Sequence, residues 1–505
     1  MIVPIFVILP LFAAFINSIV GKFIKNFSDI FVNLINFVLM VLSFLALYKL
    51  GLSDTKTFVY LVGGWEIPFG IAMVMDFYTV FMLLIVNVVA FFVGLYAVEY
   101  MEKYTEKWGF YSLFELMLTG MNGVIISGDI FNIFVFLEIA SIGSYALVSF
   151  GTEKEELEAT FKYIVLGSIS TGLILLGIIL TYGYTSTLNL ADISKTIKGL
   201  SNDYTIKFIL LLFIIGFGIK AAVVPLHSWL PDAHPSAPAP ISAMLSGVLI
   251  KTLGVYLISR FIFNVFPIDY KMLSIISYLG MLSMIVGVIL ALYQWDYKRL
   301  LAYHSISQVG YMLLGIGLGT PLGILGGIFH LMNHSIFKSL LFLTSGVLEH
   351  TFNTRDLKKL SSFELPVSKI MPTTTFSAYV GSLSIAGVPP FNGFWSKLII
   401  IIACIQAKNL LGAFVAIIVS ILTLSSFLKV LKYGFYSSAG QEEKLANNNV
   451  EKESFIFMKI SMVCLAILCI ILGVLLYPEI KRVFLQNVVD VLYQTDHYSS
   501  IILSQ

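Results

Sequence analysis

The chain has 505 residues, of which 58% are hydrophobic and only 12% are charged, and its net charge is +2. A soluble domain carries roughly a quarter of charged residues to cover its surface, so this composition excludes a string of soluble domains. The small net charge and the lack of a basic tract argue against binding to nucleic acid. We therefore predict one all-α integral membrane domain over residues 1–505, embedded in the lipid bilayer.

Membrane-spanning helices are expected where about 20 mainly apolar residues follow one another. No basic region precedes the first run, so it is interpreted as a spanning helix and not as a removed signal. About fourteen runs qualify, at residues 2–20, 29–50, 71–98, 110–127, 130–150, 160–182, 205–224, 239–262, 272–293, 300–318, 320–347, 370–405, 410–432 and 455–477. An even number of spans places both termini on the same side of the membrane. Lysine and arginine are more frequent in the loops on the other side, and positive charge is retained in the cytoplasm, so both termini are predicted to lie outside.

Prolines interrupt two of these runs, at Gly216–Pro235 and at Ala386–Lys397. Proline removes a helical hydrogen bond and clashes with the preceding turn, so two broken helices are predicted. A lysine lies within eight residues of each break, and the pattern Ala-x-Val-Pro occurs in both, at Ala222–Pro225 and Ala386–Pro389. Matched broken helices are typical of the internal repeats of transporters. The alternative is that the prolines kink these helices for packing only.

Four lysines and one glutamate stand out within the apolar runs: Lys220, Lys251, Lys338, Lys397 and Glu138. Each charge would cost about 2.5–3.5 kcal/mol at the bilayer centre, so together they would exceed the stability of a typical domain. They must face the bundle interior, where burial and a nearby carboxylate shift a lysine pKa in opposite directions. A lysine between these effects can take up and release a proton, which predicts a proton relay. The alternative for Glu138 is a static ion pair with a lysine, although buried pairs stabilise poorly.

His330, His334 and Lys338 follow one another at four-residue spacing. On a helix, successive members turn by about 40° and rise by about 6 Å, so they form one polar stripe. Histidine titrates near neutral pH, which favours a path for protons over a purely structural stripe. A metal site is a third alternative, but the glutamate that follows the first histidine of hydrolytic zinc helices is missing. No bound metal is predicted.

Four further polar residues are candidates for proton uptake or release. His227, Asp232 and His234 flank the first break, where they could equally cap the broken helix, and His304 begins a span. The chain has no phosphate loop, dinucleotide fingerprint or cysteine cluster, because its three cysteines all lie in apolar segments. No cofactor is therefore expected.

Several segments together resemble a known family. They are Met121–Asp129 through Glu138 to Ser144 and Tyr145, Lys220–Pro235, Lys251, Lys298–Gln308, His330–Lys338 and Pro389–Lys397. On these residues the chain resembles the antiporter-like subunits shared by respiratory complex I, Mrp-type sodium/proton antiporters and membrane-bound hydrogenases. The Asn-Gly before Glu138 and the Tyr-His-Ser around His304 are more similar to the D-type subunit of Mrp antiporters and the hydrogenase relatives than to complex I.

The resemblance implies about fourteen transmembrane helices with two inverted five-helix repeats, at about 110–262 and 272–432, each containing one broken helix. It also implies the order of a relay: Glu138 pairs with Lys220, Lys251 leads towards the centre, the His330, His334 and Lys338 stripe continues the path, and Lys397 completes it.

The function expected from this resemblance is proton translocation by one subunit of a multi-subunit Mrp-type Na⁺/H⁺ antiporter in the plasma membrane, beside other membrane subunits. The alternative is the same pumping subunit in a membrane-bound hydrogenase or an NADH:quinone oxidoreductase-like complex, with no redox centre of its own. A third hypothesis is that the chain is a purely structural membrane scaffold, in which the buried charges would have no function in transport.

Overall fold

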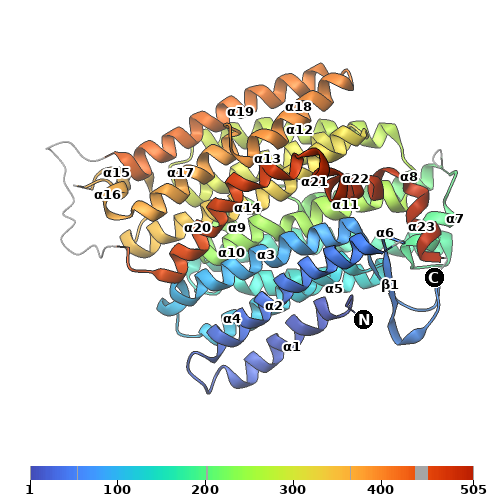
Figure 1. Ribbon diagram of the computed structural model, residues 1–505, viewed down its shortest axis with the longest axis horizontal. Helices are drawn as coiled ribbons and strands as arrows, with labels where there is room; N and C mark the ends of the chain where they lie inside the picture. The colour runs from blue at the N-terminus through green and yellow to red at the C-terminus, as the bar shows by residue number, and fades with distance from the viewer. Residues whose placement is uncertain (1, 54, 201–202, 364, 438–452, 504–505) are drawn as a thin grey trace.

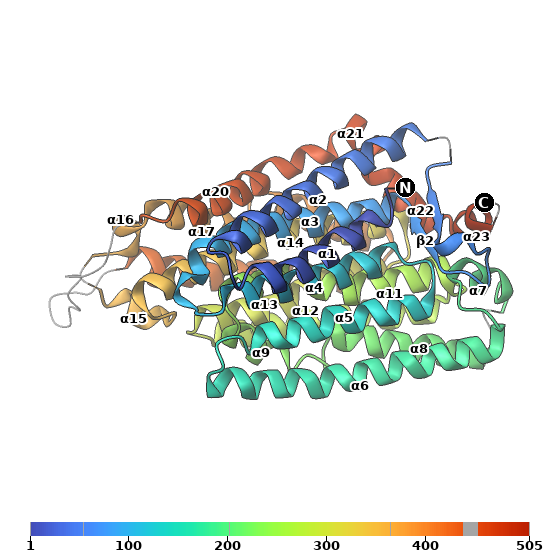
Figure 2. The same ribbon diagram turned by 90° about the horizontal axis from the view of Figure 1, so that it is seen from below.

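The computed structural model describes residues 2–53, 55–200, 203–363, 365–437 and 453–503. Long helices run side by side in an elongated bundle (Figure 1). Both chain termini lie at one end of this bundle, together with α7 (Leu190–Thr196) and α23 (Thr495–Leu503), in both views (Figures 1 and 2). We call this the terminal end, and we call the end with α15 (Leu357–Ser361) and α16 (Val367–Ile370) the opposite end. The two termini therefore lie at the same end of the bundle, and the side of the membrane that this end faces stays a prediction.

Every predicted apolar run contains a helix or several consecutive helical stretches. In chain order these are α1 (Ile5–Val20), α2 (Phe27–Leu52), α3 (Phe77–Tyr100), α4 (Lys107–Ile126), α5 (Ile130–Val148), α6 (Lys154–Thr185), α8 (Tyr204–Lys220), α10 (Ala239–Met244) to η5 (Phe261–Val265), α12 (Tyr270–Leu292), α13 (Tyr297–Gly317), α14 (Pro321–Phe352), α17 (Pro372–Ala386) with α18 (Asn392–Gln406), α19 (Leu410–Leu431) with η6 (Lys432–Tyr436), and α20 (Ile456–Ile471) with η7 (Leu472–Leu476). Within the described ranges, nine helices are long and apolar enough to cross a membrane, and α1 and α18 are shorter apolar helices. The chain is a multi-pass membrane protein, and the count of fourteen crossings stays a prediction.

The all-α prediction missed a small β-hairpin near the terminal end. Strand β1 (Phe58–Leu61) pairs antiparallel with β2 (Ala72–Met75), and the 3₁₀ turn η1 (Val62–Gly64) follows β1. The predicted run 71–98 therefore begins with a strand, and its helix starts only at Phe77, where the Asp76 carboxylate accepts a hydrogen bond from the Thr79 amide. A continuous apolar run does not reveal this change, because strand and helix are both apolar here.

Short elements outside the apolar runs also escaped prediction. They are η2 (Met101–Lys103), α7, α9 (Leu230–Ser236), α15, α16, α21 (Pro478–Val483), α22 (Leu485–Tyr493) and α23. Of these, α22 buries Leu485, Val488, Val489 and Leu492 on one face. The chain beyond the last apolar run thus covers part of the terminal end.

Glycines let several long helices approach to backbone contact. A Cβ on Gly280 of α12 would lie 2.7 Å from the Leu314 nitrogen of α13, and one on Gly287 would lie 2.6 Å from the Ser307 nitrogen. Membrane helices associate through small residues of this kind, because lipid provides no hydrophobic drive to bring them together. The α12–α13 pair is held by close packing of this sort.

Both predicted helix breaks are present. Helix α8 ends at Lys220, and the chain continues through a non-helical segment to α9. Helix α17 ends at Ala386, where Gly387 has φ +81°, and α18 begins at Asn392. Because each break lies next to one of the intramembrane lysines, broken backbone and buried charge occur together in two places.

A third departure from α-helical geometry surrounds Lys251. The helix that runs from Ala239 to Val265 contains three π-helical stretches, η3 (Leu245–Leu249), η4 (Lys251–Tyr256) and η5, and it is buried along its whole length. Turns of π-helix inside α-helices are rare and occur often at functional sites. This helix occupies the centre of the bundle.

Candidate functional site

Lys220, at the end of α8, faces the polar side of α5. Its ammonium group donates to the Ser141 hydroxyl at 2.8 Å and to the Tyr145 hydroxyl at 3.3 Å, and the side chain is buried. Glu138 lies one turn before Ser141, is half-buried, and acts electrostatically on Lys220. No direct ion pair joins Glu138 and Lys220 among the described contacts, and the buried Oε1 atom of Glu138 accepts no hydrogen bond there. Ser141 therefore separates the two charges that the resemblance paired.

Lys251 lies on the central helix between two close contacts. Gly254 packs against Ala221, the residue after Lys220, where a Cβ on the glycine would lie 2.7 Å from the Ala221 Cα. Gly247 packs against Ser339, the residue after Lys338, with no room for a Cβ. Lys251 itself is fully buried, and its ammonium group has no hydrogen-bond partner in the described chain. This central lysine thus lies about one helical turn from contacts with both of its neighbours in the predicted relay.

The stripe of α14 continues from this point. Lys338 donates to the backbone oxygen of Leu301 on α13. His334 has no hydrogen-bond partner on either ring nitrogen in the described residues, and its electrostatic interactions are with Lys251, Lys338, His330 and Lys397. All members of the stripe are fully buried. His334 therefore lies among the lysines.

His330 connects three helices. One ring nitrogen lies 2.9 Å from the Ser396 hydroxyl of α18, and the other lies 3.1 Å from the Gln308 side-chain oxygen of α13. Because Ser396 directly precedes Lys397, this hydrogen bond brings the stripe to the second broken helix.

Lys397 is bound to the break itself. Its ammonium group donates to the backbone oxygens of Ile385 at 2.7 Å and Ala386 at 3.3 Å, the last carbonyls of α17. The C-terminal carbonyls of a helix carry partial negative charge and favour a cation. The break therefore supplies acceptors that an unbroken helix would use internally.

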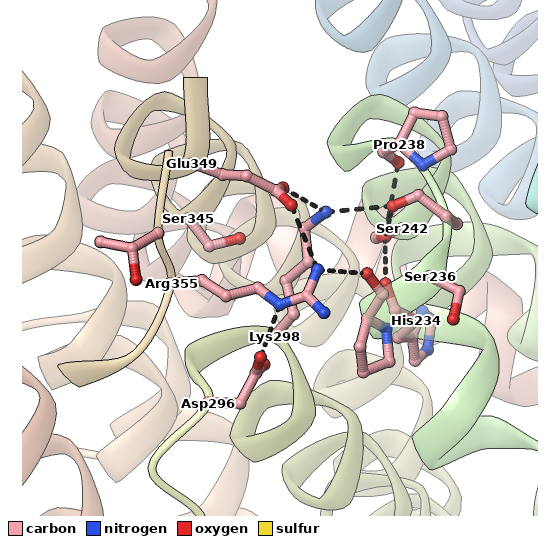
Figure 3. Close-up of polar contacts among 12 residues, drawn as sticks. His234, Ser236, Pro238, Ser242, Asp296, Lys298, Ser345, Glu349 and Arg355 are labelled. Carbon is pink, nitrogen blue, oxygen red and sulfur yellow. Dashed lines mark hydrogen bonds and ion pairs between the residues drawn. The ribbon is translucent and has the colours of Figure 1, made fainter. Parts of the chain in front are cut away.

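A polar cleft of about 370 Å³ lies beside the starts of α6 and α13 and the ends of α9 and α14. Lys298 is almost completely buried there, and its ammonium group contacts the Glu349 carboxylate at 2.6 Å and the Ala237 backbone oxygen at 3.0 Å (Figure 3). Arg355 contacts both Glu349, at 3.1 Å, and Asp296 (Figure 3). This cluster was not predicted as part of the site, because Lys298 was named only as the first residue of a segment that carries the family resemblance.

His234 lies behind this cluster (Figure 3). It is fully buried without a hydrogen-bond partner on either ring nitrogen in the described chain, and Lys298, Lys251 and Lys338 all act on it electrostatically. Of the four uptake candidates, His234 is the one placed between the cleft and the lysines.

The other three candidates lie apart from it. Asp232 is partly exposed and pairs with Lys162 at 3.0 Å and with Arg299 at 3.6 Å. His227 is half-buried between α8 and α9. His304 is fully buried, with one ring nitrogen 2.9 Å from the Ser426 hydroxyl of α19.

Sequence reasoning also missed Glu115, a fully buried carboxyl near the start of the predicted span 110–127. No group of three or more histidine, cysteine or acidic side chains suited to a metal ion occurs in the described parts of the chain.

The chain has extensive relatives of known sequence and structure. Residues 127–423 match the profile of the family described as NADH:quinone oxidoreductase/Mrp antiporter, and residues 60–111 match that of the N-terminus of complex I chain 5. The chain is 35% identical over 442 residues to the D-type subunit of the Na⁺/H⁺ antiporter of Alkalihalophilus pseudofirmus, and the match covers 87% of each chain.

Two solved structures are similar over 99% of both chains. One is a chain of the Mrp complex from Dietzia sp., with a TM-score of 0.90 and 26% identity. The other is a chain of the membrane-bound sulfane sulfur reductase, an archaeal respiratory membrane complex, with a TM-score of 0.89 and 29% identity. Both assemblies are membrane complexes. The chain therefore belongs to the NADH:quinone oxidoreductase/Mrp antiporter family of membrane proteins.

Proposed function

We propose that the chain is the proton-translocating subunit of a multi-subunit Mrp-type Na⁺/H⁺ antiporter. The observation that carries the proposal is the chain of buried groups on four packed segments: Lys220 on α8, Lys251 on the central helix, the α14 stripe, and Lys397 on α18. The similarity of the chain to the D-type antiporter subunit of A. pseudofirmus supports its assignment to an antiporter.

In the proposed mechanism, Glu138 and Lys220 respond to each other through Ser141. A charged Glu138 favours the protonated form of Lys220, and its neutralisation favours release of that proton towards Lys251. His334 and His330 then carry protons between Lys251 and Lys397, since neutral imidazole has one donor and one acceptor nitrogen. The cleft at Lys298 and Glu349, with His234 behind it, is the proposed place of proton uptake.

The location of the chain, the side of its termini and its internal repeats are proposed on the same basis. The chain lies in the plasma membrane beside other membrane subunits, with both termini outside, and its inverted repeats at about 110–262 and 272–432 each contain one of the breaks. Protons pass through this chain, and Na⁺ is the coupled ion of the complex.

The test is Na⁺-driven proton exchange by the assembled complex in membrane vesicles. Lys220→Ala and Glu138→Gln are expected to abolish exchange while the complex still assembles. Lys207→Ala is the matched control, because Lys207 lies on the same helix but pairs with Asp269 at 3.0 Å away from the relay. Exchange at the control rate in both relay variants would show that the relay is wrongly assigned.

A second candidate function is the same pumping subunit in a respiratory or hydrogenase-type complex. The similarity to a chain of the sulfane sulfur reductase favours it. Purification of the native complex distinguishes the two: redox subunits that co-purify with the chain would replace the antiporter proposal, whereas small membrane subunits without redox centres would support it.

Gly387→Ala is expected to lower exchange several-fold. Gly387 has φ +81°, which disfavours any other residue, and an added Cβ would lie 2.9 Å from the Lys397 Cδ, so the lysine side chain must shift relative to the carbonyls of α17. Gly319→Ala is the matched control, because Gly319 also has a positive φ, +63°, but its Cβ would meet Leu273 and no relay residue. Equal losses in the two variants would attribute the effect to backbone strain alone.

A further inference from the structure

Glu115 on α4 is a buried carboxyl that the proposed relay does not use. Its side chain is fully buried, and neither carboxyl oxygen has a hydrogen-bond partner in the described chain. No basic side chain of the described residues contacts it, and the neighbour that interacts with it is the amide of Asn36, outside regular hydrogen-bond geometry. This carboxyl differs from Glu349 and Asp76, each of which contacts a basic partner.

The neighbours of Glu115 offer oxygen atoms that are also unpartnered. Asn36 is 1% exposed, and neither its amide oxygen nor its amide nitrogen has a partner in the described chain. Asn33 lies one turn earlier on α2, and its buried side-chain oxygen also has no hydrogen-bond partner in the described chain. Space for both amides comes from Gly94 of α3, where a Cβ would lie 2.9 Å from the Asn33 oxygen and 3.4 Å from the Asn36 nitrogen. Three helices thus converge on one small polar region.

Polar groups farther along the same helices have partners in the described chain. Farther along the same bundle, Asn87 of α3 and Asn122 of α4 donate to each other's oxygens at 3.4 and 3.2 Å. Thr119, one turn beyond Glu115, donates to the Glu115 backbone oxygen at 2.7 Å. The polar groups beyond Glu115 therefore satisfy one another, and those beside it do not.

A row of polar groups joins Glu115 to a helix end. Asp29, Asn33 and Asn36 share one face of α2 at helical spacing. Tyr111 interacts with Asp29 and Asn33 and donates to the Gly94 backbone oxygen at 3.3 Å. At the end of this row, Lys107 pairs with Asp29 at 2.8 Å, and both side chains remain partly exposed. Oxygen-bearing side chains thus lie in a row between this partly exposed ion pair and Glu115.

Charge balance selects the class of ligand. A carboxylate without a partner in an apolar interior is strongly unfavourable and must be neutralised. A proton would neutralise Glu115, but its single O–H group can donate to only one of the two unpartnered amide oxygens, so the other would stay without a donor. A divalent cation would leave an excess positive charge. A singly charged ion that prefers oxygen ligands satisfies both conditions.

We propose that Glu115, Asn36 and Asn33 form a binding site for an alkali-metal cation between α2, α3 and α4. The site is separate from the relay residues, because none of its members contacts α8, α14 or α18 in the described contacts. It neither requires nor follows from the proposed transport activity, and its test measures binding.

The experiment uses thermal denaturation of the purified, assembled complex. NaCl, KCl and LiCl are each titrated against choline chloride at constant ionic strength. A ligand that binds only the folded protein raises the midpoint temperature with saturable dependence on its concentration. We expect such a rise with at least one of the three cations, and its loss in Glu115→Gln and in Gly94→Ala, which keeps the carboxyl but fills the space beside the amides.

Two control variants make the result specific. Thr119→Val removes a buried hydroxyl that donates to the Glu115 backbone oxygen but leaves the proposed ligand side chains unchanged, and it should keep the cation-dependent rise. Lys220→Ala should also keep it, even where it stops transport, so failure of the relay and failure of this site are distinguishable. Equilibrium binding of radioactive sodium or rubidium to the same complexes gives a second measurement if Glu115→Gln assembles poorly.

The proposal is overturned if the wild-type complex shows no cation-dependent rise and no saturable binding with any of these ions, in which case Glu115 carries only a proton. It is also overturned if Glu115→Gln and Gly94→Ala retain the wild-type dependence, since the ion would then bind elsewhere.

Discussion

Replacement of Lys251 by methionine is expected to lower proton-coupled exchange by roughly a hundredfold or more, the scale at which a positioned proton-transfer group contributes. Lys251 is fully buried on the central helix, between the contacts of Gly254 with Ala221 and of Gly247 with Ser339. Lys251→Arg should be equally inactive, because arginine keeps its proton up to a pH above about 12. The measurement is Na⁺-driven proton exchange in vesicles that contain equal amounts of assembled complex.

The arginine variant separates two roles for this lysine. If Lys251 must alternate between charged and neutral forms, arginine cannot replace it, whereas a fixed positive charge would tolerate the change. Lys429→Arg is the matched control, because Lys429 is a half-buried lysine that donates to the backbone oxygens of Leu292 and Gln294, both at 2.7 Å, outside the relay. If Lys251→Arg supported exchange at the wild-type rate, Lys251 would act only as a fixed positive charge.

Arg260→Leu is expected to destabilise the protein by about 3–5 kcal/mol, because it leaves the Asp76 carboxylate buried without its partner. The two side chains form a bidentate pair at 2.7 and 2.8 Å and are 4% and 3% exposed. The rings of Tyr78, Tyr256 and Tyr498 surround the guanidinium group at 5.1–5.6 Å. The midpoint of thermal denaturation of the purified complex measures the loss.

The double variant Asp76→Asn with Arg260→Leu should recover most of this stability. Asparagine keeps the cap at the start of α3, where the Asp76 side chain accepts from the Thr79 amide, and it removes the stranded charge. A double variant as unstable as Arg260→Leu would assign the loss to packing against the three tyrosines and not to charge.

The helices and their breaks could be predicted from the sequence because their causes are local. Apolar length alone locates helices such as α2 and α12, and prolines mark the ends of α8 and α17. The hairpin of β1 and β2 could not be predicted in this way, because its second strand is as apolar as α3 and only Asp76 separates the two. The π-helical turns around Lys251 could not be predicted either, because an apolar run does not distinguish π-helical from α-helical turns.

The candidate site was only partly accessible from the sequence. Lysines in apolar runs stand out by composition, so Lys220 and Lys251 could be named from the sequence alone. Their partners could not, because Ser141 is separated from Lys220 by 79 positions and the contact depends on how α5 and α8 pack. The same holds for Lys298 and Glu349, which lie at the ends of two different helices. Glu115 was overlooked because its span was expected to begin close to it.

The two glycine contacts of the central helix have a mechanical consequence. Gly254 packs against the Ala221 backbone and Gly247 packs against Ser339, so the central helix is in close contact with its neighbours on both sides of Lys251. If the end of α8 moves towards the bundle axis when Lys220 changes its proton, the central helix must move with it and press on α14. A displacement at Lys220 would then reach Lys338 before any proton arrives, so that α8, the central helix and α14 would move together.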